Sequence, residues 1–128
     1  MTPPTLGIAL TTDMAHYAPG GTIIARLTAS GVSDEAITLH FRSAQRCDFV
    51  IQDTNGTTLW QWGADRMFAQ AIGAETLGPA RTELVCREQF AAPRTAGTYR
   101  IVGSLTSSDR PMSAVVSITV GGQSSGRP

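Results

Sequence analysis

The sequence predicts an all-β fold, an immunoglobulin-like antiparallel β-sandwich of about eight strands. Apolar residues alternate with polar ones along short stretches of the chain, a pattern that turns one face of each strand toward a core and the other toward water. Clusters of glycine, proline and other turn-forming residues separate these stretches. No stretch shows the 3.6-residue apolar periodicity of a long helix. A chain of 128 residues can bury such a core as one domain.

Each predicted strand is defined by apolar residues that lie two positions apart and therefore share a face. In chain order these sets are Leu6, Ile8 and Leu10; Ile23, Ala25 and Leu27; Leu39 and Phe41; Cys47, Phe49 and Ile51; Leu84, Cys86 and Phe90; Tyr99, Ile101 and Leu105; and Met112, Ala114, Val116, Ile118 and Val120. A subset of these side chains is expected to be largely buried. Its members are Phe41, Phe49, Ile51, Leu84, Tyr99, Ile101 and Val116.

A β-hairpin is predicted around Asp53-Thr54-Asn55-Gly56. Asn-Gly readily adopts the positive φ angles of a type I′ turn, whose twist matches the strands that it joins. Residues 58–62 then form the return strand, on which Trp60 and Trp62 share a face. The same turn residues match only part of a calcium-binding loop, without its downstream ligands or closing glutamate. We therefore expect a hairpin turn and no metal site.

The pattern of residues 64–74 fits two structures. Phe68 and Ile72 are four positions apart, which suits one helical turn. Phe68, Gln70 and Ile72 also alternate as on one face of a strand. Of the two, we expect the strand.

The chain is expected to divide into a sandwich domain and a tail. Residues 5–120 form the predicted immunoglobulin-like domain. Residues 121–128 are rich in glycine and serine, the composition of flexible linkers, so they are expected to form a flexible tail.

The charge balance limits the classes of partner. The chain carries 10 basic and 10 acidic residues, so its formal net charge is zero. Nucleic acids and anionic membranes select clustered positive charge, so neither is expected as a partner. No apolar run reaches the roughly 20 residues of a membrane span, and the first residues lack the features of a signal peptide. We expect a cytoplasmic monomer, with export as the alternative if a signal peptide was removed.

The sequence contains two cysteines, Cys47 and Cys86, which allow one bridge. Neither lies near a histidine in the sequence, so a zinc site has no support. They fit either two small core residues or a disulfide between strands, which would suggest an oxidising compartment. Because the sequence shows no export signal, we expect reduced thiols.

Gly97-Thr98-Tyr99 resembles the tyrosine corner of immunoglobulin-like domains, in which a tyrosine hydroxyl bonds back to the preceding corner. In those domains the second core cysteine lies two residues later, and Ile101 occupies that place here. A bridge between Cys47 and Cys86 would therefore not be the immunoglobulin disulfide.

The sequence gives no reason to predict an enzyme or a cofactor. Nucleophile elbows, zinc-protease motifs, phosphate loops and dinucleotide fingerprints are all missing. The two histidines are His16 and His40. His40 alternates with apolar neighbours and His16 lies in a turn, so both are expected on the surface in water.

Several motifs between residues 39 and 72 occur in a fixed order. They are Phe41-x-Ser43-x-Gln45-Arg46-x-Asp48-Phe49, Gly56, Trp60-x-Trp62, Met67-Phe68 and Gln70, joined outside this range by Tyr17-x-Pro19-Gly20, Leu77-Gly78-Pro79 and Gly97-Thr98-Tyr99. In order and spacing they resemble the intracellular proteinase inhibitor family, named for a Bacillus cytoplasmic inhibitor of a subtilisin-type serine protease. Cys47 departs from the pattern, since an aromatic residue is more usual there, as does the reversed order of Gly78 and Pro79.

The resemblance implies a proteinaceous inhibitor of a subtilisin-like intracellular serine protease, which would bind through surface loops of a rigid sandwich. Such an inhibitor needs a segment that loses little conformational entropy on binding, and it needs no catalytic residues. The alternative is a non-inhibitory immunoglobulin-like interaction domain of a cell-envelope or multidomain assembly, because the fold alone does not decide function.

Tryptophan and arginine are enriched at interface hot spots, and residues 63–67 form the loop that we expect to enter a protease cleft. The candidate partner-binding residues are Trp60, Trp62, Asp65, Arg66 and Met67. Two alternatives stay open. The tryptophans can pack in the core or shield its edge, and the loop can merely cover the sandwich while the hairpin at Asn55-Gly56 or the turn at 31–35 makes the contact.

Overall fold

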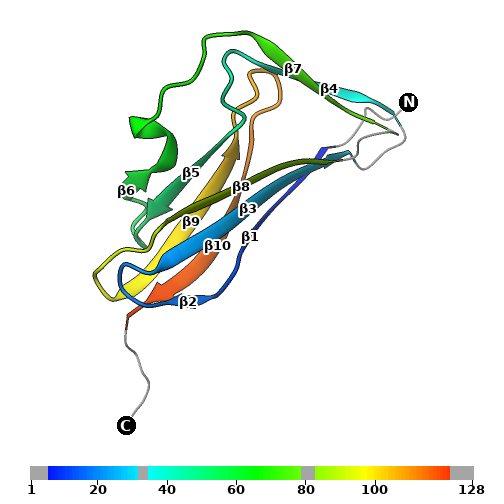
Figure 1. Ribbon diagram of the computed structural model, residues 1–128. Coiled ribbons are helices and arrows are strands. Elements are labelled where there is room, and N and C mark those ends of the chain that lie inside the picture. The colour runs from blue at the N-terminus through cyan, green and yellow to red at the C-terminus, as the bar shows by residue number, and fades with distance from the viewer. Residues whose placement is uncertain (1–5, 32–34, 79–82, 122–128) are drawn as a thin grey trace.

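The computed structural model describes residues 6–31, 35–78 and 83–121. These residues form an all-β structure in which a three-stranded and a five-stranded sheet pack face to face, as Figure 1 shows. The predicted antiparallel β-sandwich is confirmed. Most residues of the predicted tail, 122–128, lie outside the described residues, as do residues 32–34 of one predicted turn and Pro79 of another.

The three-stranded sheet has the order β1-β3-β8, and both of its pairings are antiparallel. Its strands are β1 (Leu6–Thr12), β3 (Thr22–Gly31) and β8 (Glu83–Ala91). The outer edge of β8 has no partner strand within this sheet. Along β8 the inward phase runs Leu84, Cys86, Glu88 and Phe90. An acidic residue therefore occupies an inward position on this edge strand.

The five-stranded sheet has the order β2-β10-β9-β5-β6. Its pairings are antiparallel except for the short parallel pair of β2 and β10. Its strands are β2 (His16–Tyr17), β10 (Met112–Val120), β9 (Gly97–Leu105), β5 (Cys47–Gln52) and β6 (Thr58–Gln61).

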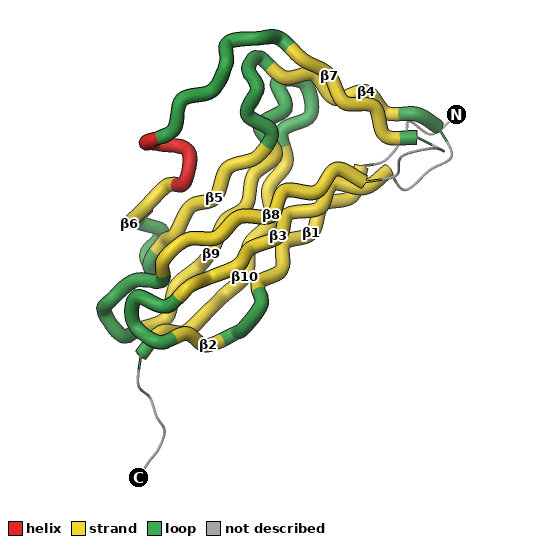
Figure 2. The backbone as a smooth tube through the Cα atoms, in the orientation of Figure 1, coloured by secondary structure: helices red, strands yellow, loops and turns green. Residues whose placement is uncertain are grey.

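A separate antiparallel pair joins β4 (Ile37–Phe41) to β7 (Gly73–Leu77). Figure 1 shows this pair beyond one end of the two sheets, on the opposite side from the C-terminus. One turn of 3-10 helix, η1 (Trp62–Asp65), follows β6. The chain between η1 and β7 runs along the outer margin of the molecule in Figure 2.

The apolar side chains that alternate along the strands pack into two hydrophobic clusters. The main core lies between the two larger sheets and is made of Tyr17, Ile23, Ala25, Leu27, Cys47, Phe49, Ile51, Phe90, Ala92, Tyr99, Ile101, Ile118 and Val120. The second cluster joins the β4–β7 pair to the sandwich and is made of Leu6, Ala29, Ile37, Leu39, Phe41, Leu77, Leu84 and Leu105. All the side chains predicted to be largely buried are buried except Val116, which is partly buried against the main core.

The predicted hairpin joins β5 to β6, but its turn is not type I′. A type I′ turn needs two residues with positive φ, and in the described chain only glycines have positive φ, Gly56 at 84° among them. Gly56 N donates to Asp53 O at 3.1 Å, and Asp53 N donates to Thr57 O at 3.0 Å. Residues 53–56 thus form a β-turn that ends in a left-handed glycine. The pairing of β5 with β6 shifts register beside it, between Ile51 and Gln52.

The predicted strand over residues 64–74 is wrong, and so is the extension of the return strand to Trp62. β6 ends at Gln61, η1 covers Trp62–Asp65, and β7 begins only at Gly73. Phe68 and Ile72 also do not share an environment, because Phe68 is half-buried while Ile72 is 86% exposed. The contact of Phe68 with the ring of Trp62 sets the structure here, rather than the alternating pattern.

The expectation of reduced thiols is also contradicted, because Cys47 and Cys86 form a disulfide. Cys47 begins β5 in the five-stranded sheet and Cys86 lies on β8 in the three-stranded sheet. Their Cα atoms are 6.4 Å apart, within the usual range for a disulfide. The bridge therefore links the two sheets across the main core. The sequence allowed this one bridge but did not decide whether it forms.

The tyrosine corner predicted at Tyr99 is present. The hydroxyl of Tyr99 donates to the carbonyl oxygen of Thr95 at 2.6 Å, and the ring is buried in the main core. This bond holds the chain that enters β9, the central strand of the five-stranded sheet.

Candidate functional site

The candidate residues lie at one edge of the five-stranded sheet, on β6, on η1 and at the start of the segment that follows. We call residues 66–72 the exposed segment. The side chain of Asp65, the last residue of η1, lies outside what the structure describes. The other candidates divide into two tryptophans that pack inward and two residues, Arg66 and Met67, that are exposed.

Trp60 and Trp62 both pack against the main core. The ring of Trp60 lies 4.9 Å from the ring of Phe90, and the ring of Trp62 meets Phe49 edge-on at 6.4 Å between centroids. Both tryptophans are partly buried. The interpretation in which they shield the edge of the core is therefore confirmed, and they do not form a free aromatic patch.

Asp48 makes the chain turn away from the sheet after Gln61. Its Oδ1 accepts a hydrogen bond from the backbone N of Gly63 at 2.8 Å, and its Oδ2 accepts one from Gln61 Nε2 at 2.5 Å. A Cβ at position 63 would lie 2.8 Å from Gln45 Nε2 and 2.9 Å from Asp48 Oδ1. A larger residue at position 63 would therefore displace the Gln45 amide or the Asp48 carboxylate that holds the start of η1.

Trp62 anchors the residues on both sides of Met67. The guanidinium of Arg66 lies 4.2 Å from the centroid of the Trp62 ring, and Arg66 Nε donates to Trp62 O at 3.1 Å. The ring of Phe68 packs against the same indole at 5.8 Å. Stacking of a cation and of a second ring on tryptophan is favourable. Met67, between the two anchors, is 98% exposed.

The anchoring indole has one unsatisfied group. Its Nε1 is buried and has no hydrogen-bond partner within the described chain. A buried donor without a partner costs about 1–3 kcal/mol.

The far end of the exposed segment is held by the loop before β5. Ala44 N donates to Ala69 O at 2.9 Å. Arg46 lies over the ring of Phe41 at 4.3 Å, and its Nε donates to Glu75 on β7 at 2.9 Å. Gly73 approaches Arg46 so closely that a Cβ would lie 2.7 Å from its Nη2. These contacts fix where the segment ends and β7 begins.

A shallow open groove lies between the edges of β6 and β8. It is lined by Ile51, Leu59, Trp60, Arg66, Gln89, Phe90, Ala91 and Pro93. Leu59 is 50% exposed at its rim. Arg66 is part of this lining, so the groove and the exposed segment adjoin at that residue.

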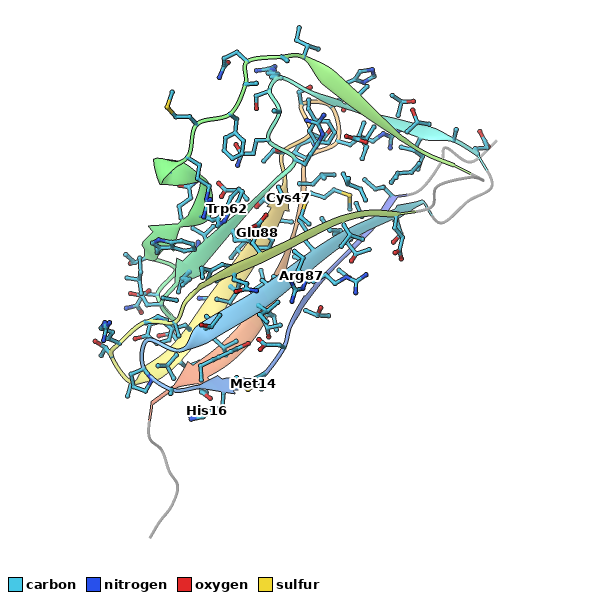
Figure 3. All side chains as sticks on the ribbon, in the orientation of Figure 1. Met14, His16, Cys47, Trp62, Arg87 and Glu88 are labelled. Carbon is cyan, nitrogen blue, oxygen red and sulfur yellow. A yellow bond between two sulfur atoms is a disulfide. The ribbon has the colours of Figure 1, made fainter. Side chains whose placement is uncertain are left out.

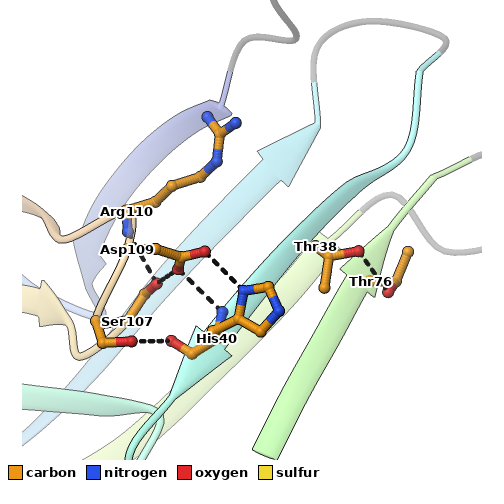
Figure 4. Close-up of polar contacts among 7 residues, drawn as sticks. Thr38, His40, Thr76, Ser107, Asp109 and Arg110 are labelled. Atoms are coloured by element: carbon orange, nitrogen blue, oxygen red, sulfur yellow. Dashed lines mark hydrogen bonds and ion pairs between the residues drawn. The ribbon is translucent and has the colours of Figure 1, made fainter.

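A polar cluster on β4 and the loop before β10 joins a histidine, an aspartate and a serine, as Figure 4 shows. His40 Nδ1 is 2.7 Å from Asp109 Oδ2, and the hydroxyl of Ser107 donates to Asp109 Oδ1 at 2.6 Å. In a hydrolytic triad the imidazole lies between the carboxylate and the hydroxyl. Here the carboxylate lies between them, so Ser107 has no base at its hydroxyl.

The role of this cluster is to attach β4 to the loop before β10. The backbone N of His40 also donates to Asp109 Oδ1 at 3.0 Å, and Ser108 N donates to His40 O at 2.8 Å. Hydrogen bonds from Ser107 and with His40 hold the pKa of the Asp109 carboxyl well below its usual range. His40 is exposed, as predicted, but it has a charged partner that the sequence did not indicate.

Two kinds of site are missing from the described residues, a metal-binding cluster and a membrane-spanning helix. The described residues contain no group of three or more metal-ligating side chains. Asp53, the first residue of the partial calcium motif, instead accepts hydrogen bonds from Asn55 N and Thr57 N at 2.9 and 3.0 Å. Within residues 6–31, 35–78 and 83–121, no helix is both long enough and apolar enough to span a membrane.

Comparisons with known proteins give one matching family and several solved structures with a similar fold. The model of a family described as BsuPI, intracellular proteinase inhibitor, matches residues 10–110. None of the curated proteins searched matches the chain. Among solved structures, the sporulation control protein Spo0M of Bacillus subtilis is 14% identical with a TM-score of 0.63, over 92% of this chain and 50% of that one. The chain thus spans about half the length of that protein.

Two further structures share the fold at low identity. A CARDB domain from Pyrococcus furiosus, solved with di-metal ions, is 15% identical with a TM-score of 0.53, over 92% of this chain and 94% of that one. A β-glucosidase from Listeria innocua is 14% identical with a TM-score of 0.52, over 93% of this chain and 16% of that one. These likenesses show a common sandwich and no common function.

Proposed function

Because the chain belongs to the BsuPI family of intracellular proteinase inhibitors, we propose that it inhibits a subtilisin-like serine protease by binding it directly. The family match over residues 10–110 is the observation that carries the proposal, since it spans strands of both large sheets as well as the exposed segment. A protease as partner follows from the family. The subtilisin-like class is the finer part of the proposal, and the resemblance of the motifs between residues 41 and 70 supports it.

The structure supports inhibition by binding because it combines a rigid body with an exposed, anchored segment. Met67 is exposed, and the residues on both sides of it are held against Trp62. A segment ordered before binding loses little conformational entropy in the complex. An interface of the standard size of about 1,600 Å² then supplies nanomolar affinity if its central contacts are good.

The candidate residues have different roles in this proposal. Met67 faces the protease and Arg66 borders the contact. Trp62 holds Arg66 from behind, and Trp60 packs on Phe90 of the core. Asp65 lies at the end of η1, immediately before this contact. Because the chain has no net charge, no long-range charge attraction drives association. We expect the inhibition constant to depend little on salt concentration.

A titration of the purified protein against a subtilisin-like protease tests the proposal. Protease activity is expected to fall linearly to near zero at a molar ratio close to unity. The double variant Arg66→Ala/Met67→Ala is expected to inhibit much more weakly. A cysteine protease titrated in parallel is the specificity control, and its activity should remain unchanged.

The possible outcomes test the inhibitory function and the contact through Arg66 and Met67 separately. No inhibition by the intact protein contradicts the proposal and favours the non-inhibitory interaction domain. Inhibition that is unchanged in the double variant supports the function and excludes this contact, leaving the hairpin at Asn55-Gly56 or the turn at 31–35.

For the compartment, we propose the exported alternative rather than the cytoplasm. The disulfide between Cys47 and Cys86 supports it, since disulfides persist in oxidising compartments and are rare in the cytosol. Thiols should be alkylated during lysis of the native cells, and the unreduced protein should then be analysed by mass spectrometry. A disulfide-linked peptide pair is expected, and two alkylated cysteines would instead support the cytoplasm.

A further inference from the structure

Met67 has the largest exposed fraction of any large apolar side chain in the described part of the chain, 98%. Single exposed apolar side chains are common on protein surfaces, so the assignment depends on this exposure together with the anchoring of both neighbours of Met67. We propose that Met67 is the side chain that fills the primary specificity pocket of the target protease, an inference that rests on the proposed inhibition. The backbone around it then lies in the cleft as a substrate does.

The anchors on either side of Met67 support this assignment. Arg66 and Phe68 both contact one indole, that of Trp62, at 4.2 and 5.8 Å between the centres of their groups. Trp62 in turn meets the fully buried ring of Phe49. With both neighbours turned back onto the body of the protein, the side chain of Met67 is directed away from it.

The backbone of the exposed segment is suited to a cleft. None of residues 66–72, all of which the structure describes, belongs to a strand of this protein. Figure 2 shows the segment at the outer margin, away from the paired strands. Proteases hold extended peptides by main-chain hydrogen bonds, as in strand addition, and read alternate side chains in pockets. A segment outside the sheets can make such bonds without breaking a strand pair.

The chemistry of the segment indicates the kind of pocket. Methionine is long, unbranched and apolar, so it suits a deep apolar pocket. The nearest cation, Arg66, is turned onto Trp62 and bonded to its carbonyl oxygen. A protease whose pocket carries a carboxylate at its base selects a cation at this position, and Met67 offers none. The target is therefore a protease with a deep, uncharged pocket.

Oxidation footprinting of the wild-type protein tests the inference without a substitution. Hydrogen peroxide transfers one oxygen atom to an accessible thioether, giving the sulfoxide and water. Met14, which is 50% exposed, is the internal control. Figure 3 shows it beside β2, and β2 lies at the opposite edge of the five-stranded sheet from β6, the strand that precedes Trp62. In the complex with a subtilisin-like protease, oxidation of Met67 should slow by about tenfold or more while Met14 is unaffected.

Substitutions at the same position give a second, independent measurement. Met67→Leu should keep the inhibition constant within about tenfold, because a volume-conserving apolar side chain still fills the pocket. Met67→Asp should raise it by about 100-fold or more, because the pocket would bury a carboxylate. Met67→Arg should gain inhibition of a trypsin-like protease that the wild type does not inhibit. Met14→Asp is the matched control and should leave the inhibition constant unchanged.

The results distinguish this inference from the function on which it rests. Inhibition by the wild type together with equal oxidation of Met67 in the free and bound protein would overturn the inference and keep the function. Equal inhibition by the wild type and Met67→Asp would do the same. If the wild type inhibits no subtilisin-like protease, the proposed function and this inference fail together.

Discussion

The turn between β5 and β6 and the exposed segment between η1 and β7 are both loops on the same edge of the sandwich, but they are held in different ways. The turn is stabilised by its own residues, because the Asp53 side chain accepts hydrogen bonds from Asn55 N and Thr57 N. The exposed segment is held by Trp62 and by Ala44, which lie outside it. A loop that stabilises itself needs only its own sequence, whereas an anchored loop depends on the fold beneath it.

The largest expected effect is at Phe49, on which the anchor of the exposed segment rests. Phe49→Ala should lower the free energy of unfolding by about 3–5 kcal/mol, because it removes a fully buried ring and its contacts with Trp62 and Phe90. Urea denaturation measures the change. Val115→Ala, at a side chain 56% exposed, is the control and should stay within about 0.5 kcal/mol. An unchanged midpoint for Phe49→Ala would contradict the core that we describe.

Removal of the disulfide tests how much it stabilises the two sheets that support the exposed segment. Replacing both cysteines in Cys47→Ala/Cys86→Ala should lower the free energy of unfolding by about 3–4 kcal/mol in the chain-entropy model, since the bridge closes a loop with a sequence separation of 39. Denaturation of the wild type with and without reductant should show a similar loss. The double variant should not respond to the reductant, and equal stability of all these samples would argue against the bridge.

Two substitutions at Trp62 separate anchoring of the segment from stability of the turn. Trp62→Ala removes the surface on which Arg66 and Phe68 lie, so limited proteolysis should cut within residues 66–72 much faster while the Asp53 turn is unaffected. We expect about 2 kcal/mol of lost stability, less than for a fully buried tryptophan. Trp62→Phe keeps a ring and removes the unpaired Nε1, so its stability should change by less than about 1 kcal/mol.

The reverse experiment acts on the turn alone. Asp53→Ala removes the acceptor for two backbone N–H groups and should cost about 1 kcal/mol. Proteolysis of the exposed segment should not change. Asp53→Asn keeps an oxygen acceptor and should recover most of the loss. Faster cleavage within residues 66–72 in Asp53→Ala would show that the two loops are coupled, contrary to the comparison.

The smallest expected effect concerns pH at the polar cluster of β4. The folded pKa of Asp109 is lowered from its ordinary value of 3.8, so the unfolded chain binds more protons at acidic pH. Its stabilisation is complete above that ordinary value and is lost as the pH falls through and below it. Asp109→Asn should therefore flatten the acid side of the stability profile. Asp13, whose pKa is lowered by the hydroxyl of Tyr17, should leave a residual slope in the same direction.

The strands could be predicted because they depend on a pattern within each stretch of sequence. Alternation located the buried faces of β3, β5 and β9, and the tyrosine corner was visible as Gly97-Thr98-Tyr99. Val116 is less buried than predicted, since alternation gives the face of a strand but not how completely its neighbours cover it. The turn at Asn55-Gly56 was located correctly, but its type depends on backbone angles that the dipeptide alone does not fix.

The candidate site was only partly accessible from the sequence. The pattern of Phe68, Gln70 and Ile72 predicts a strand, yet the position of Phe68 is set by the indole of Trp62, a contact that no periodicity reveals. The pairing of Cys47 with Cys86 likewise depends on which strands face each other across two sheets. The sequence placed Trp60, Trp62, Arg66 and Met67 in one region, which stays a predicted contact. It did not show that the tryptophans pack inward while Met67 is exposed.

Glu88 on β8 bears on how the protein behaves at high concentration. Its strand is the outer strand of the three-stranded sheet, and its side chain takes an inward position next to the disulfide, as Figure 3 indicates. If a strand of another molecule paired with this edge, it would cover the Glu88 carboxylate and remove it from water, which costs free energy. A charge placed inward on an edge strand thus discourages sheets from joining edge to edge.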